Sequence, residues 1–237
     1  MKKDLSISVF FPCFNDAGSI GLLVKDAYST LKKITNDFEI IVIEDGSRDE
    51  SRKILERLAE EIKELKLVIH AKNTGYGGAL RSGFAHASKD LIIYTDGDGQ
   101  YDIKELTKLL DKLSDDVDVV QGYKIRRHDP WYRLLIGRSY HHLSKFLFRL
   151  KIRDVDCAFR LIRKECLKSI TFKYNSGVFC VELVKKLQNK GCRFVEVGIN
   201  HYPRLYGHSQ FFNYKRIIKS LMELIVLWFN LVILGKD

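Results

Sequence analysis

The chain has 237 residues, of which 46% are hydrophobic and only 3 are proline, a globular composition that excludes an intrinsically disordered protein. Lysine and arginine outnumber aspartate and glutamate by 40 to 30, and the formal net charge of +10 suits nucleic acid, nucleotide phosphates or an anionic membrane surface. The 5 cysteines contain no C-x-x-C pair, which argues against a disulfide framework or a zinc site and fits a reducing cytosol.

Short apolar runs alternate with helical periods through the first half of the chain. Met1 leads within a few residues into a strand pattern, without an apolar segment of signal-peptide length, so we expect the catalytic body in the cytoplasm. Nearly continuous apolar runs indicate strands that helices cover on both faces. The alternation favours a single α/β domain with an open, doubly wound, mostly parallel sheet. We predict strands at residues 7–11, 39–43, 67–69, 91–95 and 117–121, and helices at 19–34, 49–65, 78–87 and 103–113.

Residues 124–153 are rich in arginine, lysine, histidine and aromatic side chains. Leucine and phenylalanine recur there at helical spacing, which predicts an amphipathic helix with a cationic face. Two interpretations stay open: a solvated helix that packs on the sheet, or a segment that binds an acceptor or a membrane.

The α/β pattern resumes after Cys157, with a helix predicted at residues 178–189 and a strand at 193–199. The last segment, residues 211–234, is strongly apolar, and its most apolar part is shorter than the ~20 residues that a membrane-spanning helix needs. We therefore expect an interfacial helix, or one docked on a membrane-embedded partner, in preference to a C-terminal core or dimer helix. Its few polar residues fall on one helical stripe: Arg216, Ser220, Glu223 and Asn230.

Two carboxylates follow the fourth predicted strand, in the sequence T-D-G-D-G-Q at residues 95–100. Ligands of open α/β sheets bind at the carboxyl ends of the strands. Asp96 and Asp98 repel each other unless a cation compensates them, and oxygen ligands of this kind favour Mg²⁺ or Mn²⁺. A D-G-D sequence alone is more often a turn, but its position after a strand favours a metal site.

Other polar segments are expected at the same edge of the sheet. The sequence E-D-G-S-R-D at residues 44–49 follows the second strand; Asp45 is available for base or ribose recognition, whereas Ser47 and Asp49 suit helix capping. The first strand ends in F-P-C-F-N-D, residues 11–16. The glycine-rich sequence N-T-G-Y-G-G-A-L-R, residues 73–81, is neither a P-loop nor G-x-G-x-x-G, but it precedes a helix and could offer backbone N–H groups to a nucleotide.

In order and spacing, these four segments resemble glycosyltransferase family 2, whose members are inverting enzymes with the Rossmann-like GT-A fold. The sequences R-D-V-D-C-A-F-R-L at 153–161 and Y-P-R-L-Y-G-H-S at 202–209 are similar to segments of dolichyl-phosphate mannose or glucose synthases. The resemblance covers most of the chain. It implies a GT-A domain over residues 1–210, with 124–153 facing acceptor or membrane, and a C-terminal amphipathic, membrane-associated helix over 211–237.

The resemblance also implies roles for individual residues. Where the family often has two aspartates before G-S, this chain has Glu44-Asp45, so Glu44 is not assigned as a ligand. The nucleotide would contact Pro12, Asn15, Asp45, Gly75 and Asp96. The metal would be held by Asp96, Asp98 and Gln100. The acceptor phosphate or the leaving diphosphate would meet Arg126, Arg127, Arg204 and Ser209, and the catalytic set would be Asp154, Asp156 and Arg204.

The reaction implied is a single displacement at the anomeric carbon, in which a hexose passes from a UDP- or GDP-linked sugar to a dolichyl or undecaprenyl phosphate. A phosphate acceptor is already anionic and needs no strong base, so Asp154 is either a base or an orienting carboxylate. Asp156 is the alternative to Asp154, and a structural role for both, as ion-pair partners of Arg153 and Arg160, stays open.

Three other functions remain as alternatives. A family relative would act on a soluble or polysaccharide acceptor, and a non-catalytic protein would bind nucleotide sugars. A nucleic-acid-binding protein is disfavoured because the acidic edge would repel phosphates. The partners expected are therefore the nucleotide sugar, polyprenyl phosphate and an anionic membrane surface, with a second copy of the chain or a membrane-embedded protein as further candidates.

Overall fold

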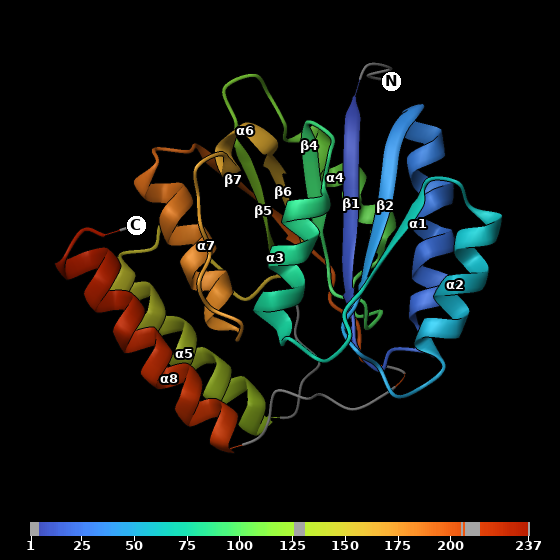
Figure 1. The fold of residues 1–237 in the computed structure, drawn as a ribbon. Coiled ribbons are helices and arrows are strands. Elements are labelled where there is room, and N and C mark those ends of the chain that lie inside the picture. Colours follow the sequence, from blue (N-terminus) through green and yellow to red (C-terminus); the bar gives the residue numbers. More distant parts are fainter. Residues whose placement is uncertain (1–4, 126–130, 205, 207–213, 237) are drawn as a thin grey trace.

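A seven-stranded sheet runs through the centre of the molecule (Figure 1). The computed structural model describes residues 5–125, 131–204, 206 and 214–236. The strand order is β3-β2-β1-β4-β6-β5-β7, and of these seven strands only β6 runs antiparallel to its neighbours. The predicted α/β class with a mostly parallel sheet is confirmed. The strands are β1 (Ser6–Cys13), β2 (Asp37–Glu44), β3 (Leu65–Ile69), β4 (Leu91–Tyr94), β5 (Val119–Lys124), β6 (Arg160–Arg163) and β7 (Phe194–Ile199).

The helices cover both faces of this sheet. The connections β1-α1-β2 and β3-α3-β4 cross the sheet in opposite directions, so right-handed crossovers place α1 and α3 on opposite faces. In Figure 1, α3 and α7 lie in front of the strands. The helices are α1 (Ile20–Ile34), α2 (Ser51–Glu61), α3 (Tyr76–His86), α4 (Leu106–Asp111) after the 3₁₀ turn η1 (Ile103–Glu105), α5 (Trp131–Phe148), α6 (Lys164–Leu167), α7 (Val178–Asn189) and α8 (Tyr214–Trp228), which continues into the π-helical turn η2 (Phe229–Ile233).

Several elements differ from the sequence prediction: the helix predicted at 103–113 is η1 followed by α4, and α6 has no predicted counterpart. The helix predicted through residue 65 ends at Glu61, because Leu65 already begins β3. Strand β6 is not predictable from apolar pattern, because two of its four residues are arginines and it therefore lacks a continuous apolar run.

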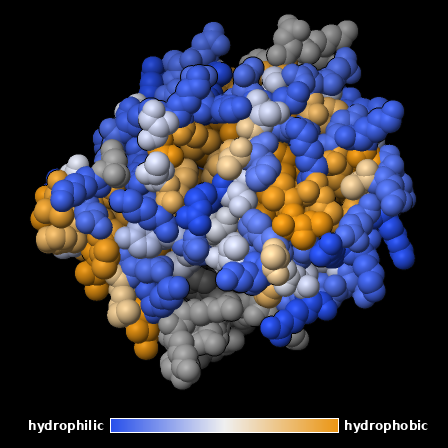
Figure 2. Space-filling model, viewed as in Figure 1, coloured by the Kyte–Doolittle hydropathy of each residue, from blue (hydrophilic) through white to orange (hydrophobic). Residues whose placement is uncertain are grey.

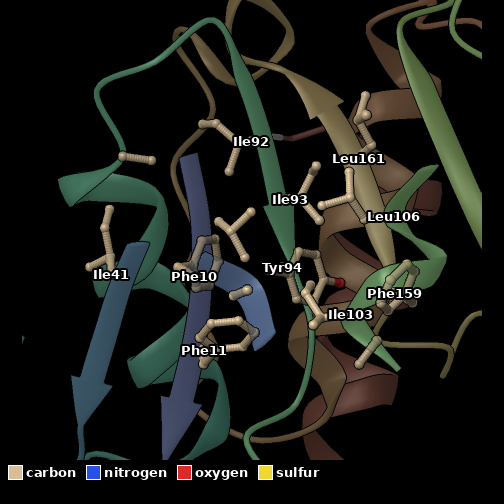
Figure 3. Packing of buried hydrophobic residues seen from close by; sticks show 14 of the residues in the cluster. Phe10, Phe11, Ile41, Ile92, Ile93, Tyr94, Ile103, Leu106, Phe159 and Leu161 are labelled. Atoms are coloured by element: carbon tan, nitrogen blue, oxygen red, sulfur yellow. The ribbon is translucent and has the colours of Figure 1, made fainter. Parts of the chain in front are cut away.

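Aromatic packing fixes β1 and β4 side by side in the core (Figure 3). The Phe10 ring stacks on Tyr94 at a centroid distance of 5.5 Å and meets Phe84 of α3 edge-on at 5.0 Å. A Cβ on Gly83 would lie 2.3 Å from the Phe10 ring, so glycine is required for α3 to approach this closely. Full burial of each large apolar side chain contributes about 1.5–3 kcal/mol. This packing aligns the ends of β1 and β4, where the acidic segments begin.

A second apolar cluster joins α8 to α7, with Leu224, Leu227 and Leu231 buried. On the predicted polar stripe, Ser220 is also buried, and Glu223 accepts a hydrogen bond from the Ser176 hydroxyl at 2.5 Å. The polar stripe therefore lies at least partly against the protein body. Across the described residues, we find no helix with the length and hydropathy that a bilayer crossing requires.

Candidate functional site

The polar segments of the sequence meet at one edge of the sheet, where the parallel strands β1, β2, β4 and β5 end. Because β6 is antiparallel, the segment that precedes it arrives at this same edge. The reversal of β6 is what brings Asp154 and Asp156 to the ends of β4 and β5.

Asp96 and Asp98 lie at the centre of this edge, and the cation Arg204 forms an ion pair with Asp98. The Tyr76 hydroxyl, at the start of α3, donates a hydrogen bond to Asp96 Oδ1 at 2.8 Å. Burial, followed by repulsion from Asp98, raises the pKa of Asp96 to about 7, although Lys124 and Arg204 act in the opposite direction. The edge therefore holds two close carboxylates at an electrostatic cost that a cation would relieve.

The donor atoms at this edge fit Mg²⁺ or Mn²⁺, since both ions prefer carboxylate oxygens and accept substrate phosphate as a further ligand. Glycine is needed between the two carboxylates, because a Cβ on Gly97 would lie 2.4 Å from the Pro12 carbonyl oxygen. Gly99 has a φ of +74°, which favours glycine. The two aspartates are thus held by a turn that packs directly against the end of β1.

Gln100 links this turn to the segment that carries Arg204. Its backbone N–H donates to Asp98 Oδ1 at 3.0 Å, and its side-chain amide donates to the Tyr202 carbonyl at 3.0 Å. The Tyr202 N–H in turn donates to the Gln100 carbonyl at 2.9 Å. These contacts connect Asp98 to the segment that carries Arg204, and the role of Gln100 as a metal ligand stays a prediction.

Asp45, at the end of β2, holds the glycine-rich loop in place. Its buried carboxylate accepts hydrogen bonds from Thr74 N–H at 2.9 Å, the Thr74 hydroxyl at 2.7 Å and Gly75 N–H at 3.1 Å. His70 Nδ1 lies 2.7 Å from the same carboxylate, and its Nε2 lies 2.9 Å from the Ser82 hydroxyl on α3. Asp45 and Gly75, both of which are predicted to contact the nucleotide, are therefore joined to each other by a hydrogen bond in this structure.

The loop after β1 is joined to the loop after β2. Asn15, whose φ is +58°, accepts a hydrogen bond from Arg48 N–H at 2.8 Å and donates its own backbone N–H to the Ser47 hydroxyl at 3.0 Å. Ser47 therefore binds the neighbouring loop. Asp49 does so too, since it accepts from Ala17 N–H at 3.0 Å, and it also accepts from Ser51 N–H at the start of α2. Together with buried Pro12, these contacts place Asn15 and Asp45 at adjacent strand ends.

Asp154 is buried beside Lys124, the last residue of β5. Lys124 Nζ lies 3.6 Å from Asp154 Oδ2, and Asp156 N–H donates to Asp154 Oδ1 at 3.1 Å. Arg153 forms an ion pair with Glu196 at 3.8 Å, and the fully buried Arg160 donates to Gln121 and to the Val155 carbonyl.

A pocket of about 210 Å³ opens next to Asp154. Three cationic side chains line it, and His141 places a ring nitrogen within 4.8 Å of the carboxylates of both Asp154 and Asp156. Its walls come from β5, α5 and the segment after α5: Tyr123, Lys124, Arg138, His141, Arg153 and Asp154.

Several residues of the candidate site carry no signal in the sequence alone. Tyr76, His70 and Thr74 are missed because each acts on a carboxylate from another segment. Lys124 and Arg138 fall within the cationic segment 124–153, but nothing in the sequence distinguishes them from its other cationic residues. The predicted acceptor residues Arg126, Arg127 and Ser209 lie outside the described residues.

Comparison with known proteins gives both sequence and fold relatives. Residues 8–171 match the family model described as glycosyl transferase family 2. The undecaprenyl-phosphate 4-deoxy-4-formamido-L-arabinose transferase of Enterobacter sp. (strain 638) is 28% identical over 92% of this chain and 66% of its own length. The protein of the same name from Sodalis glossinidius is 26% identical over 98% and 68%. This chain thus spans about two thirds of the length of these relatives.

Solved structures support the fold. Glucosyl-3-phosphoglycerate synthase from Mycobacterium tuberculosis, in complex with Mn²⁺, UDP and phosphoglyceric acid, superposes with a TM-score of 0.69 at 16% identity, over 95% of this chain and 78% of that one. Mannosyl-3-phosphoglycerate synthase from Rubrobacter xylanophilus gives a TM-score of 0.71 at 15% identity, over 95% and 74%. At these identities the likeness concerns the fold alone.

Proposed function

Because this chain belongs to glycosyl transferase family 2, we propose that it transfers a glycosyl group from a nucleotide sugar to a polyprenyl phosphate, with inversion at the anomeric carbon. The main support is the proximity of an acidic pair and a cationic pocket at one sheet edge. Lys124, which lines the pocket, is close enough to lower the pKa of Asp96. A donor diphosphate and an acceptor phosphate can therefore occupy neighbouring sites. The named sequence relatives, which carry undecaprenyl phosphate in their names, support this acceptor class.

On the donor side, Asp96 and Asp98 would hold Mg²⁺ or Mn²⁺. The bound cation would neutralise charge on the leaving nucleotide diphosphate. Arg204, which pairs with Asp98 in this structure, would exchange that carboxylate for phosphate oxygens when the donor binds. The network of Asp45 and Gly75 would shape the nucleoside site by fixing the glycine-rich loop.

On the acceptor side, Lys124, Arg138 and Arg153 would bind the phosphate of the lipid. One of its anionic oxygens forms a bond to the anomeric carbon as the bond from that carbon to the diphosphate oxygen breaks. No proton has to be removed from the attacking oxygen. We therefore assign Asp154 as a residue that orients Lys124, and catalysis would depend largely on positioning.

We also propose that α5 and α8 bring this pocket to the cytoplasmic face of a membrane. The two helices lie side by side in Figure 1, and Figure 2 shows apolar side chains along the same border of the molecule. Phe146 of α5 is 81% exposed, and Ile225 and Met222 of α8 are 60% and 59% exposed. Arg138 and His141 belong to α5, so contact of this face with lipid would present the pocket to a headgroup phosphate.

Steady-state kinetics of an Arg138→Gln variant test the acceptor site. With a nucleotide sugar that supports turnover, Mg²⁺ or Mn²⁺ and undecaprenyl phosphate, we expect the variant to raise KM for the lipid phosphate about tenfold and to leave KM for the donor unchanged. Arg57→Gln, at an exposed position on α2, serves as the control and should leave both constants unchanged. If product forms with a soluble phosphomonoester but not with lipid phosphate, the proposed acceptor class is wrong and the acceptor is a soluble phosphate.

A further inference from the structure

The fold brings two cysteines and an aspartate together at the edge of the sheet opposite the candidate active site. Asp118 precedes β5, Cys192 lies just before β7, and Cys166 belongs to α6, directly after β6. Since β5 and β7 are parallel and β6 runs against β5, the end of β6 meets the beginnings of the other two strands. Figure 1 shows α6 at this end of the sheet, near the amino-terminal ends of the strands.

The three side chains converge on one point. One ligand atom from each, the two Sγ atoms and a carboxylate oxygen, lies within 4.8 Å of the others. Arg193 N–H donates to Asp118 Oδ2 at 2.7 Å, which orients the carboxylate. Cys166 is buried and Cys192 half-buried, so the site is shielded but accessible.

We propose that Asp118, Cys166 and Cys192 form a binding site for Zn²⁺, with a water molecule as the fourth ligand. Two thiolates and one oxygen suit a borderline-soft ion of tetrahedral preference and do not suit Mg²⁺. The site is independent of the proposed transfer reaction, which uses carboxylates at the other edge of the sheet.

The charges around the site fit this assignment. Binding requires each thiol to lose its proton, so Zn²⁺ would replace two protons and leave two thiolates beside one carboxylate. The ion, together with the nearby ammonium group of Lys190, would oppose those three negative charges. Lys190 is fixed nearby by hydrogen bonds from Nζ to the carbonyls of Cys166 at 3.1 Å and Lys168 at 2.6 Å.

The ion would add a direct link between three segments that backbone and side-chain hydrogen bonds already hold near one another. Helix α6 has only four residues, and the turn before Cys192 contains Gly191, whose φ is +80°. A metal that bridges both to Asp118 would fix them against β5, and its fourth position would stay open to water. The absence of a C-x-x-C pair argues against zinc only for ligands that are neighbours along the chain, whereas these ligands meet through the topology of the sheet.

Cobalt substitution tests the site with a spectroscopic readout. The full chain, reduced and held in excess Mg²⁺ to occupy the carboxylate pair, is titrated with Co²⁺ and then with Zn²⁺. We expect a thiolate-to-cobalt charge-transfer band that saturates at one ion per chain and disappears on addition of Zn²⁺. Zinc binding should release about two protons and, at zinc concentrations near 100 times the Kd, raise Tm by roughly 5–10 °C.

Variants assign the ligands. Cys192→Ser changes a half-buried position and should abolish the charge-transfer band and the Tm rise, while circular dichroism shows that the variant is folded. Cys180→Ala, which removes a thiol from α7, should keep both signals. The proposal is overturned if the folded wild type gives no thiolate band, if Cys192→Ser retains it, or if the purified chain carries a Cys166–Cys192 disulfide that persists under thiol reductant.

Discussion

Replacing Asp45 tests whether the end of β2 holds the glycine-rich loop as the structure describes. The carboxylate is 3% exposed and accepts three hydrogen bonds from Thr74 and Gly75 in addition to its contact with His70. Hydrogen bonds to a charged group contribute about 1.5–3 kcal/mol each but are not additive when they share one acceptor. Because Thr74 and Gly75 are half-buried, water can replace part of the loss. We expect Asp45→Ala to lower the free energy of unfolding by about 3 kcal/mol.

Urea unfolding with linear extrapolation measures this change. Thr74→Val removes one hydroxyl donor. A double-mutant cycle that combines it with Asp45→Asn should give a coupling energy between the two side chains of about 1 kcal/mol. Asp26→Asn, a more exposed carboxylate on α1, is the matched control and should stay within about 0.5 kcal/mol of the wild type. A loss below about 1 kcal/mol for Asp45→Ala would refute the network. Unchanged stability with lost nucleotide affinity would assign Asp45 to direct nucleoside contact instead.

Three further predictions address the metal site, pH dependence and the membrane face. Tyr76→Phe removes the hydroxyl that orients Asp96 and should weaken Mn²⁺ affinity about tenfold by calorimetry; an unchanged Kd would contradict that role. Burial acts to raise the pKa of Glu39, but Lys66 and the hydroxyls of Ser8 and Ser88 lower it to about 2. The ionised carboxylate therefore stabilises the folded state fully above its ordinary pKa near 4.5, and this contribution is lost as the pH falls through about 2. Glu39→Gln should therefore lower the free energy of unfolding by about 2 kcal/mol at pH 7, and by much less near pH 2; equal losses at both pH values would exclude this linkage. Phe146→Asp should reduce co-sedimentation with anionic vesicles several-fold, whereas Leu22→Asp, on α1 and 68% exposed, should not; equal effects would remove α5 from the membrane face.

Much of the fold follows from local sequence pattern. The strands β1, β2 and β4 each contain a continuous apolar run, so burial of those runs on both faces is predictable, and the carboxylates after β4 then fall at the edge where ligands bind. Strand β6 is different because its burial depends on partners elsewhere. Arg160 is fully buried with Gln121 and the Val155 carbonyl as acceptors and the Tyr94 ring beneath its guanidinium.

The contacts that complete the candidate sites also depend on tertiary structure. Tyr76 reaches Asp96 because α3 starts beside the end of β4, and Arg204 reaches Asp98 through the hydrogen bonds of Gln100 with Tyr202. Neither pair can be deduced from spacing along the chain. The same holds for the two cysteines at the opposite edge, which only the reversal of β6 brings together.

The central claim is glycosyl transfer to a lipid phosphate at the edge that carries Asp96 and Asp98. Its most direct test incubates the purified chain with nucleotide sugars, Mg²⁺ or Mn²⁺ and undecaprenyl phosphate, and determines the anomeric configuration of the product by NMR. We predict a polyprenyl-phosphate sugar with configuration opposite to that of the donor, and its loss in Asp98→Asn. A product with retained configuration, or equal turnover by Asp98→Asn, would contradict it.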